Sequence, residues 1–391
     1  MKYPPLWSAE VEARVRAEAC NMDPQKVPDH VQMCVRCVVT NQRPRITFDS
    51  EGVCSACRYW ERKASGIDWT AREAELRALL GKHRGTSGYD VIVPASGGKD
   101  SSMVAHRLKH DYGMHPLLVK WGPFIYTDIG RKNWDAIGQR FDTIEARPNG
   151  LLHRRLSRLS LEYLGDNFDP FVYGQLAFPM QVAAKFGVNL VFGAENQEAE
   201  YGGDMSAADK PRWDLADWSR VYMKGAGIER LIEIGHILGS LSRTEAGELS
   251  RFYYVLPEHG VEYHHLGYYL PHWPMDNFYQ AQEHCGFEPD PERSEMTYTR
   301  FASLDDKTDW LHYRMAFVKF GIGRCTSDAA QQVRAGDIDR DEALALVQRY
   351  DCEVPTRHVD ETLDYLGMDR AQLDRVTERF SRAKAPPHRP A

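Results

Sequence analysis

The strongest constraint on the fold is an alternation of short apolar segments with helical segments between residues 68 and 251. The apolar segments are typical of strands buried on both faces, and the segments between them space their apolar residues as amphipathic helices do. Strands are expected at residues 89–95, 115–121, 141–146 and 188–194, and helices at 70–85, 101–113, 131–141 and 175–187. This pattern predicts an α/β fold with a doubly wound, mainly parallel sheet that binds ligands at the carboxyl ends of its strands.

Two further regions flank the alternating one. A cysteine-bearing segment precedes it, and a region rich in aromatic residues and then in helix formers follows it. We therefore expect an N-terminal segment (1–66), a central sheet domain (67–250) and a helical C-terminal region (251–391) that supplies substrate and partner contacts. Within the last region, helices are expected at residues 340–351, 360–367 and 369–385, as peripheral or interface elements.

Composition narrows the class of protein. With 391 residues, 42% of them hydrophobic, the chain can bury a core of its own. Its formal net charge of -7 argues against a strong sequence-wide attraction to nucleic acid, although it leaves a local basic patch open. The first residues show no secretory signal, and the longest uncharged run, at 170–184, is too short to cross a membrane. We therefore expect a cytoplasmic protein.

The most informative motif follows the first expected strand and consists of Ser96, Gly97, Gly98, Lys99, Asp100, Ser101 and Ser102. The two glycines let backbone N–H groups approach a phosphate, and the following helix presents its positive end. The serines add hydroxyl groups, and the aspartate suggests a Mg²⁺ ion between carboxylate and nucleotide. Neither a Walker A loop nor a GxGxxG loop is present here. The alternative is a simple turn with a helix cap.

The end of the fourth expected strand offers a second nucleotide contact. Gly193 permits close approach of the backbone, and Glu195 is a candidate for a second magnesium carboxylate beside Asp100. Because this stretch carries three glutamates, an exposed loop is the alternative interpretation.

Four cysteines form two CxxC pairs with sixteen residues between them: Cys34 and Cys37, then Cys54 and Cys57. This spacing predicts a tetrahedral zinc site in a zinc-ribbon-like segment, with residues 40–54 as a short hairpin. Since all four ligand positions are filled by protein, the metal should stabilise the fold and not perform chemistry. An iron–sulfur cluster and redox dithiol chemistry are the alternatives.

The segment SGGKDS resembles the signature of the ATP pyrophosphatase (PP-loop) superfamily, which includes GMP synthetase, NAD synthetase, asparagine synthetase and several tRNA-thiolating enzymes. The resemblance implies an adenine nucleotide alpha hydrolase-like domain that cleaves ATP between its α and β phosphates and forms an adenylated intermediate. It also implies that pyrophosphate and metal are held by Ala95, Ser96, Gly97, Gly98, Lys99, Asp100, Ser101 and Ser102, with Asp100 required for catalysis.

A wider resemblance rests on MCVRCVVTNQRPRITFDSEGVCSACRY (33–59) together with PASGGKDSS, FASLDDKTD and KFGIGRCTSDAA. From about residue 31 to 366 the chain is similar to the N-acetyl sugar amidotransferases of bacterial surface-glycan pathways, such as lipopolysaccharide and O-antigen synthesis. The similarity implies conversion of an acetamido group on a nucleotide-linked or related sugar into an acetamidino group, with ATP, Mg²⁺ and a structural Zn²⁺. Because no glutaminase motif is present, it also implies a separate glutaminase with a cyclase-like subunit that channels ammonia.

The region from residue 295 to 324 mixes charged and aromatic side chains, as a nucleotide-sugar site does. Its candidate substrate residues are Tyr298, Asp306, Lys307 and Arg324, and its candidate catalytic cations, expected to contact phosphate, are Lys307 and Lys319. The alternative is a solvated helix with an apolar face.

Three histidines occur between residues 264 and 272, namely His264, His265 and His272. They could bind a metal or act as a general base, but a structural role is the more ordinary one. The Leu-Pro and Trp-Pro dipeptides nearby favour a rigid loop.

Two other functions remain open at this point. A PP-loop tRNA-thiolating ligase would need a basic face and usually a catalytic cysteine pair, whereas the paired cysteines here are assigned to a metal. A non-catalytic scaffold that binds zinc and ATP would not need the intact Asp100 loop.

Overall fold

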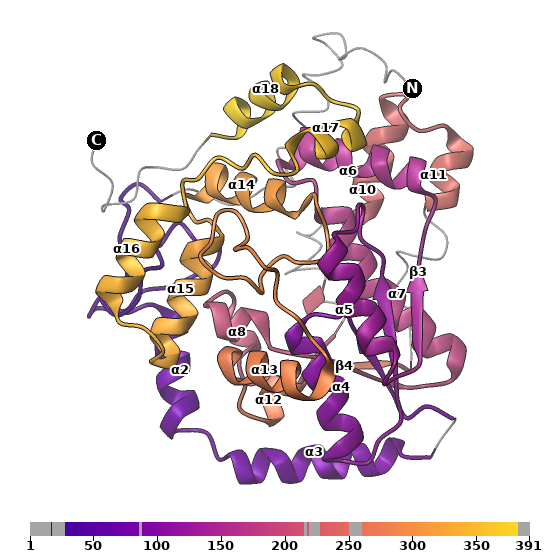
Figure 1. Cartoon of the computed structure of the whole chain (residues 1–391), viewed down its shortest axis with the longest axis vertical. Coiled ribbons are helices and arrows are strands. Elements are labelled where there is room, and N and C mark those ends of the chain that lie inside the picture. Colours follow the sequence, from indigo (N-terminus) through magenta and orange to yellow (C-terminus); the bar gives the residue numbers. More distant parts are fainter. Residues whose placement is uncertain are drawn as a thin grey trace.

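The computed structural model describes residues 17, 28–85, 88–214, 217–218, 227–249 and 260–381. A six-stranded sheet, with the order β3-β2-β1-β4-β6-β5, carries helices on both faces (Figure 1). All neighbouring strands run parallel except β5, which pairs antiparallel with β6 at one edge. The expected α/β fold with a mainly parallel sheet is confirmed.

The strands are β1 (Val91–Pro94), β2 (Pro116–Trp121), β3 (Thr143–Ala146), β4 (Leu190–Gly193), β5 (Arg212–Trp213) and β6 (Glu262–His265). The helices before β6 are α2 (Ser55–Ser65), α3 (Trp69–His83), α4 (Lys99–His110), α5 (Asp128–Gly138), α6 (Gly150–Leu164), α7 (Asp169–Phe186), α8 (Gln197–Tyr201), η1 (Met205–Ala207), α10 (Gly227–Ile237) and α11 (Arg243–Leu249). Those after it are α12 (Leu266–Tyr269), α13 (Pro274–Gln280), η2 (Ala281–Cys285), α14 (Asp309–Phe320), α15 (Arg324–Ala335), α16 (Arg340–Tyr350), α17 (Val359–Leu366) and α18 (Arg370–Phe380).

Successive residues of the central strand β1 pack against opposite layers. Ile92 belongs to the core formed with α6, α7 and α10, whereas Val91 and Val93 belong to the core formed with α3, α4 and α5. Because both faces are covered, the strand has no solvent side, which explains why its sequence is continuously apolar.

The strand order creates a crevice at the carboxyl end of β1. One neighbour, β2, follows β1 in the chain and leads outward to β3, whereas the other, β4, leads to β6 on the opposite side. Ligands bind at such a switch point in open α/β sheets. The loop after β1 and the turn after β4 flank this position, so the topology places both expected nucleotide contacts together.

Most elements expected in the central region are present. The four strands correspond to β1 to β4 and the four helices to α3, α4, α5 and α7, with Pro179 accommodated inside α7. Several elements of this region were not expected, namely α6, α8, η1, β5, α10 and α11. The short strand β6 was not expected either, because the sequence Glu262-Tyr263-His264-His265 is too polar to signal a strand and a loop was favoured.

The helices of the C-terminal region form two groups. α15 and α16 pack on the cysteine-bearing segment, whereas α14, α17 and α18 pack around Leu161 of α6 (Figure 1). The three helices expected at the end of the chain correspond to α16, α17 and α18. The domain limits stay a prediction, because the boundary at 250 lies outside the described residues and β6 joins the sheet beyond it. Within the described ranges, no helix is long and apolar enough to span a bilayer.

Replacement of Gly174 by alanine should destabilise the fold. A Cβ atom at this position in α7 would lie 2.0 Å from Cε2 of Trp121 in β2, so helix and strand must separate. We expect a loss of about 1 to 3 kcal/mol in the free energy of unfolding, measured by chemical denaturation. The matched control is Gly81→Ala in α3, where nothing lies within 4 Å and better helix propensity should add up to about 1 kcal/mol. Equal effects at the two sites would contradict the close packing of α7 on β2.

Candidate functional site

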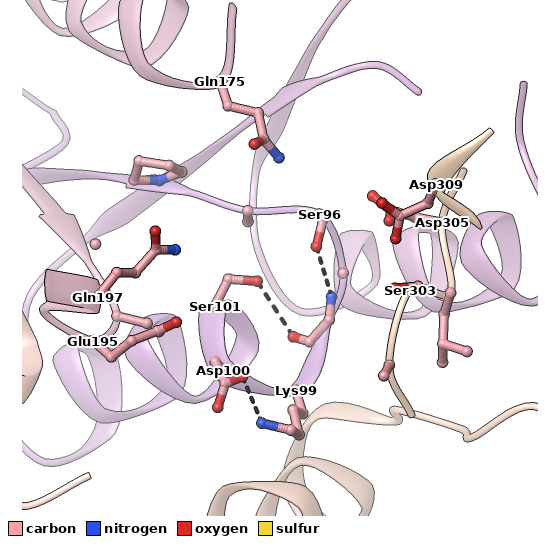
Figure 2. A pocket seen from close by; sticks show the side chains of 18 of the residues that line it. Ser96, Lys99, Asp100, Ser101, Gln175, Glu195, Gln197, Ser303, Asp305 and Asp309 are labelled. Atoms are coloured by element: carbon pink, nitrogen blue, oxygen red, sulfur yellow. Dashed lines mark hydrogen bonds and ion pairs between the residues drawn. The ribbon is translucent and has the colours of Figure 1, made fainter. Parts of the chain in front are cut away.

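A cavity of about 530 Å³ opens at the carboxyl ends of β1 and β4. One wall is the loop after β1 (residues 94–101), a second is the turn after β4 (193–197), and the opposite wall comes from residues between 301 and 332. Figure 2 shows the loop between Glu195 on one side and the pair Asp305 and Asp309 on the other. The cavity therefore joins the expected nucleotide site to the C-terminal region.

The loop after β1 has the backbone geometry of an anion site. Gly97 has a φ of +88°, and a Cβ atom there would lie 2.9 Å from the backbone nitrogen of Trp134, so only glycine fits. Gly98 is the N-cap of α4 and leaves the first N–H groups of that helix without a side-chain cap. The hydroxyl of Ser96 accepts a hydrogen bond from the Gly98 N–H at 3.2 Å. These features fit a phosphate group at the start of α4.

Asp100 is held ionised at the edge of this loop. Its carboxylate accepts hydrogen bonds from Lys99 Nζ at 2.6 Å and from Asn277 Nδ2 at 3.0 Å. Burial would raise the pKa of Asp100, but Lys99, His272 and these hydrogen bonds together hold it at about 2. The side chain is therefore a carboxylate at any neutral pH.

Glu195 faces the same cavity from the end of β4. Burial, and then the negative charge of Asp100, raise the pKa of Glu195 to about 7. The two carboxylates line the same cavity, and their negative charges repel each other. Carboxylate oxygens are the ligands that a hard divalent cation such as Mg²⁺ prefers. The residues present therefore fit the expected magnesium ion, which would relieve the repulsion.

The C-terminal region supplies a charged wall opposite the loop. Arg324, at the start of α15, forms an ion pair with Asp328 at 3.0 Å and donates a hydrogen bond to the hydroxyl of Tyr313. All three residues line the cavity, so the structure brings the predicted substrate residue Arg324 to the expected nucleotide site.

Other predicted residues lie elsewhere. Lys307 forms an ion pair with Glu361 at 2.7 Å, and the buried Lys319 donates to the carbonyl of Leu164. The carboxylate of Asp306 accepts backbone N–H groups of residues 124, 125 and 308, and the Tyr298 hydroxyl donates to the side chain of Gln332. None of these four lines the cavity, so the two lysines are not placed to contact phosphate there. Their partners come from distant segments that the sequence pattern did not reveal.

Gly193 and Ser102, both predicted nucleotide contacts, differ in whether they line the cavity. Gly193 lines the cavity, and a Cβ atom there would lie 2.5 Å from the hydroxyl of Tyr263, which explains the glycine. Ser102, by contrast, is buried under the loop at 1% exposure and does not line the cavity. The other predicted residues from 95 to 101 all do.

Several site residues were missed by sequence reasoning. Lys120, buried in β2, donates from Nζ to the carbonyl of Ser96 at 2.8 Å and so supports the loop. The sequence signal that could have identified Lys120 is a lysine within an otherwise apolar strand. His312 and Gln175 line the cavity from α14 and α7, and no local motif marks them.

The three histidines of the aromatic stretch have different environments. His264 is bonded to Tyr269 and Glu262 on the sheet, as a structural residue would be. His265 lines the cavity, and burial lowers its pKa to about 3, so it is neutral. His272 lies 3.7 Å from Asp100, and burial likewise lowers its pKa to about 3.

Comparison with protein families finds a match over part of the chain. Residues 295–386 match the C-terminal domain of WbpG-like LPS biosynthesis proteins. This similarity indicates a role in lipopolysaccharide biosynthesis. The WbpG-like segment, residues 295–386, includes the cavity wall formed by Asp305, Asp309, His312 and Arg324. None of the curated proteins compared with the chain matches it.

The four predicted cysteine ligands come together. The Sγ atoms of Cys34 and Cys57 are 3.8 Å apart, those of Cys37 and Cys54 are 3.7 Å apart, and all four lie within 4.8 Å of one another. A tetrahedron with Zn–S bonds of about 2.3 Å has edges of about 3.8 Å. The buried group can therefore hold a zinc ion, and it is compatible with the expected zinc-ribbon-like segment.

The WbpG-like segment packs directly on this cysteine group. Arg334 of α15 donates to Sγ of Cys37 at 3.7 Å, and Arg340 of α16 donates to the carbonyl groups of Cys34 and Cys37, each at 3.2 Å. Four thiolates around a bound Zn²⁺ would carry a net negative charge, which Arg334 would offset. The cysteine group thus ties the N-terminal segment to the C-terminal helices.

A buried ion pair continues this connection toward the cavity. Lys63 of α2 is 0% exposed, and its Nζ lies 2.9 Å from Glu200 of α8, which directly follows the cavity residues after β4. The same ammonium group donates to the carbonyl of His272 and lies over the rings of Trp60 and Trp273. The N-terminal segment is therefore anchored to both segments that hold Glu195 and Asp100 in place.

Removal of the thiolates of Cys34 and Cys57 should lower zinc content and stability together. Serine at either position supplies a poor ligand for Zn²⁺ and opens the tetrahedral site. We expect metal analysis of the purified variants to show loss of zinc, with a lower midpoint of thermal unfolding. Cys352→Ser is the control, since this exposed cysteine lies outside the group and should keep both values. Unchanged zinc content in the Cys34 and Cys57 variants would rule out this site.

Lys63→Met should destabilise the protein by about 3 to 5 kcal/mol, because it leaves the carboxylate of Glu200 buried without its cation. Chemical denaturation measures the effect, and Lys63→Met combined with Glu200→Gln should recover part of it. The matched control is Arg62→Met on the same helix, whose pair with Asp209 is exposed and should contribute less than about 1 kcal/mol. A Lys63 variant as stable as the Arg62 variant would show that the buried pair does not anchor the segment.

Proposed function

We propose that the protein is an ATP-dependent amidotransferase of the PP-loop type that acts on an N-acetylated, nucleotide-linked sugar in lipopolysaccharide and O-antigen synthesis. The observation that supports this most is the shared cavity, which the phosphate-type loop and the WbpG-like segment line from opposite sides. A loop of this kind suits ATP, and the WbpG-like segment suits a glycan precursor. One cavity can then bring both substrates together.

The chemistry follows from the weakness of an amide as an electrophile. The amide oxygen attacks the α phosphorus of ATP, the bond to the β phosphate breaks, and pyrophosphate leaves with its electron pair. The oxygen now carries AMP, a far better leaving group. Ammonia adds to the activated carbon and AMP departs with the C–O electron pair, so acetamide, ATP and ammonia give acetamidine, AMP and pyrophosphate.

The cavity residues have separate tasks in this proposal. The uncapped N–H groups at the start of α4 and the side chain of Lys99 hold the departing pyrophosphate. Asp100 and Glu195 are the residues that would hold Mg²⁺, which when bound neutralises phosphate charge. Arg324 lines the same cavity from the WbpG-like segment, and its charge would contact the sugar nucleotide. Enclosure by the two walls limits water, which would return the activated group to the amide.

Ammonia must come from elsewhere in this proposal. At neutral pH most of it is unreactive ammonium, so an enzyme needs local delivery of the free base. The sequence shows no glutaminase motif, and we therefore propose a separate glutaminase with a cyclase-like channelling subunit as partner.

The decisive experiment incubates the purified chain with Mg-ATP, a high concentration of ammonium chloride and a panel of UDP-N-acetyl sugars. We expect AMP to form only with an accepted sugar, and mass spectrometry to find that sugar lighter by the difference between O and NH. AMP with bulk tRNA and a sulfur donor, but with no sugar, would instead establish the thiolation alternative. Binding of ATP without AMP in any mixture would establish a non-catalytic scaffold.

Asp100→Asn is the matched variant for this experiment. It keeps the size and one oxygen of the side chain but removes the charge that fits Mg²⁺, so AMP formation should fall at least about 100-fold. Asp111→Asn at the other end of α4 is the control, because its half-exposed side chain lies outside the cavity. Full turnover by the Asp100 variant would contradict the assignment of the loop.

A further inference from the structure

His312 and Asp166 form a dyad in the wall of the cavity. Nδ1 of His312 lies 2.9 Å and 3.0 Å from the two carboxylate oxygens of Asp166. The histidine is in the first turns of α14, within the WbpG-like segment, and the aspartate precedes α7 in the central region. The dyad is therefore assembled only when these two parts of the chain pack together.

Both members of the dyad are held in position. The backbone N–H of Phe168 donates to Oδ1 of Asp166 at 2.9 Å, and the Phe168 ring lies against the His312 ring with centroids 5.5 Å apart. Because Nδ1 is engaged, Nε2 is the ring atom that remains for a ligand. Within the described part of the chain no residue is hydrogen-bonded to Nε2, although His312 lines the cavity.

The charges around the ring make it a stronger base than an ordinary histidine. Asp166 faces it from the segment before α7, Asp169 from the start of α7, and Asp309 from its own helix. Burial would lower the pKa of His312, but these three carboxylates together raise it above its usual value. The arrangement of a base oriented by a carboxylate is the one that general-base catalysis requires.

The proposed reaction has a step that needs such a base. When ammonia adds to the carbon of the N-protonated adenylated amide, the C=N electron pair moves to the sugar nitrogen and the attacking nitrogen becomes positive. In that state the attacking nitrogen is a better leaving group than AMP, so the adduct reverts. Loss of one N–H proton makes AMP the better leaving group and commits the adduct to product.

We infer that Nε2 of His312 accepts this proton from the attacking nitrogen and that Asp166 positions the imidazole for it. The lone pair left on that nitrogen then forms the new C=N bond while the C–O bond breaks and AMP departs with its electron pair. The products are AMP and an acetamidinium group, and the imidazolium returns its proton to solvent. This inference rests on the proposed amidotransferase reaction.

His312→Gln separates the two halves of the reaction in a single-turnover experiment. Enzyme in excess over the accepted sugar is mixed with Mg-ATP and ammonium chloride, and both pyrophosphate and amidine are followed after quenching. We expect the pyrophosphate phase to remain within about threefold of the unaltered enzyme while the amidine phase slows about 100-fold. His30→Gln, an exposed histidine outside the cavity, should change neither phase.

Asp166→Asn tests the positioning role. The amide keeps an oxygen for the Phe168 N–H but loses the charge that raises the pKa of His312. Because the base acts in its neutral form, amidine formation should rise with pH through that pKa. At a fixed concentration of free ammonia, the rate of amidine formation by the variant should begin to rise at lower pH than that of the unaltered enzyme. The rate that the variant reaches at high pH should also be lower. A merely structural role would lower the rate without moving the pH profile.

The outcomes distinguish the inference from the function it rests on. Unchanged amidine formation in the His312 variant would overturn the base assignment alone. So would an equal loss of the pyrophosphate and amidine phases, provided that this variant unfolds at the same temperature as the unaltered protein. An Asp166 variant whose profile keeps its position would overturn the positioning role. Absence of any sugar-dependent pyrophosphate from the unaltered enzyme would overturn the amidotransferase function and this step with it.

Discussion

The buried ion pair between Lys63 and Glu200 is the contact on which the assembly of the site depends. An ammonium group at 0% exposure is tolerated only because a carboxylate, a carbonyl oxygen and two tryptophan rings replace its water. The carboxylate comes from α8, the carbonyl and one ring come from residues 272 and 273, and the other ring comes from α2 itself, so the full environment forms only when these three segments pack together. The cysteine group fixes the start of the helix that carries Lys63, since Cys54 is its N-cap. The cysteine group, which can hold a zinc ion, is thereby linked to the cavity through one helix.

Local patterns in the sequence predicted a large part of this structure. The strands β1, β2 and β4 are buried on both faces, the turn at Gly97 needs a backbone that only glycine supplies, and the cysteine spacing matches a tetrahedral group. In each case the physical cause acts over a few residues, so it leaves a mark that a single sequence shows. The switch point at β1 then followed from the order of elements, because a parallel sheet places the ends of its strands together.

What could not be predicted depends on residues far apart in the chain. His312 and Asp166 are 146 positions apart, and nothing near either one marks it as half of a dyad. Lys307 was a candidate phosphate ligand because its region mixes charged and aromatic side chains, but Glu361 of α17 takes up its charge. β6 was missed since its strand conformation comes from pairing with β4, not from its own polar sequence. Tertiary contacts decided all three cases.

The distribution of charge in the cavity is better suited to the proposed reaction than to ATP binding alone. The loop side offers helix N–H groups and Lys99 to an anion, whereas the WbpG-like wall presents Asp305 and Asp309 together with the ion pair of Arg324 and Asp328. Carboxylates in the cavity proposed for ATP would weaken nucleotide binding unless a cation develops between them. Conversion of a neutral amide into an amidinium group creates such a cation at the sugar. An acidic wall favours the reaction as that charge appears, and it favours the transition state over the neutral substrate.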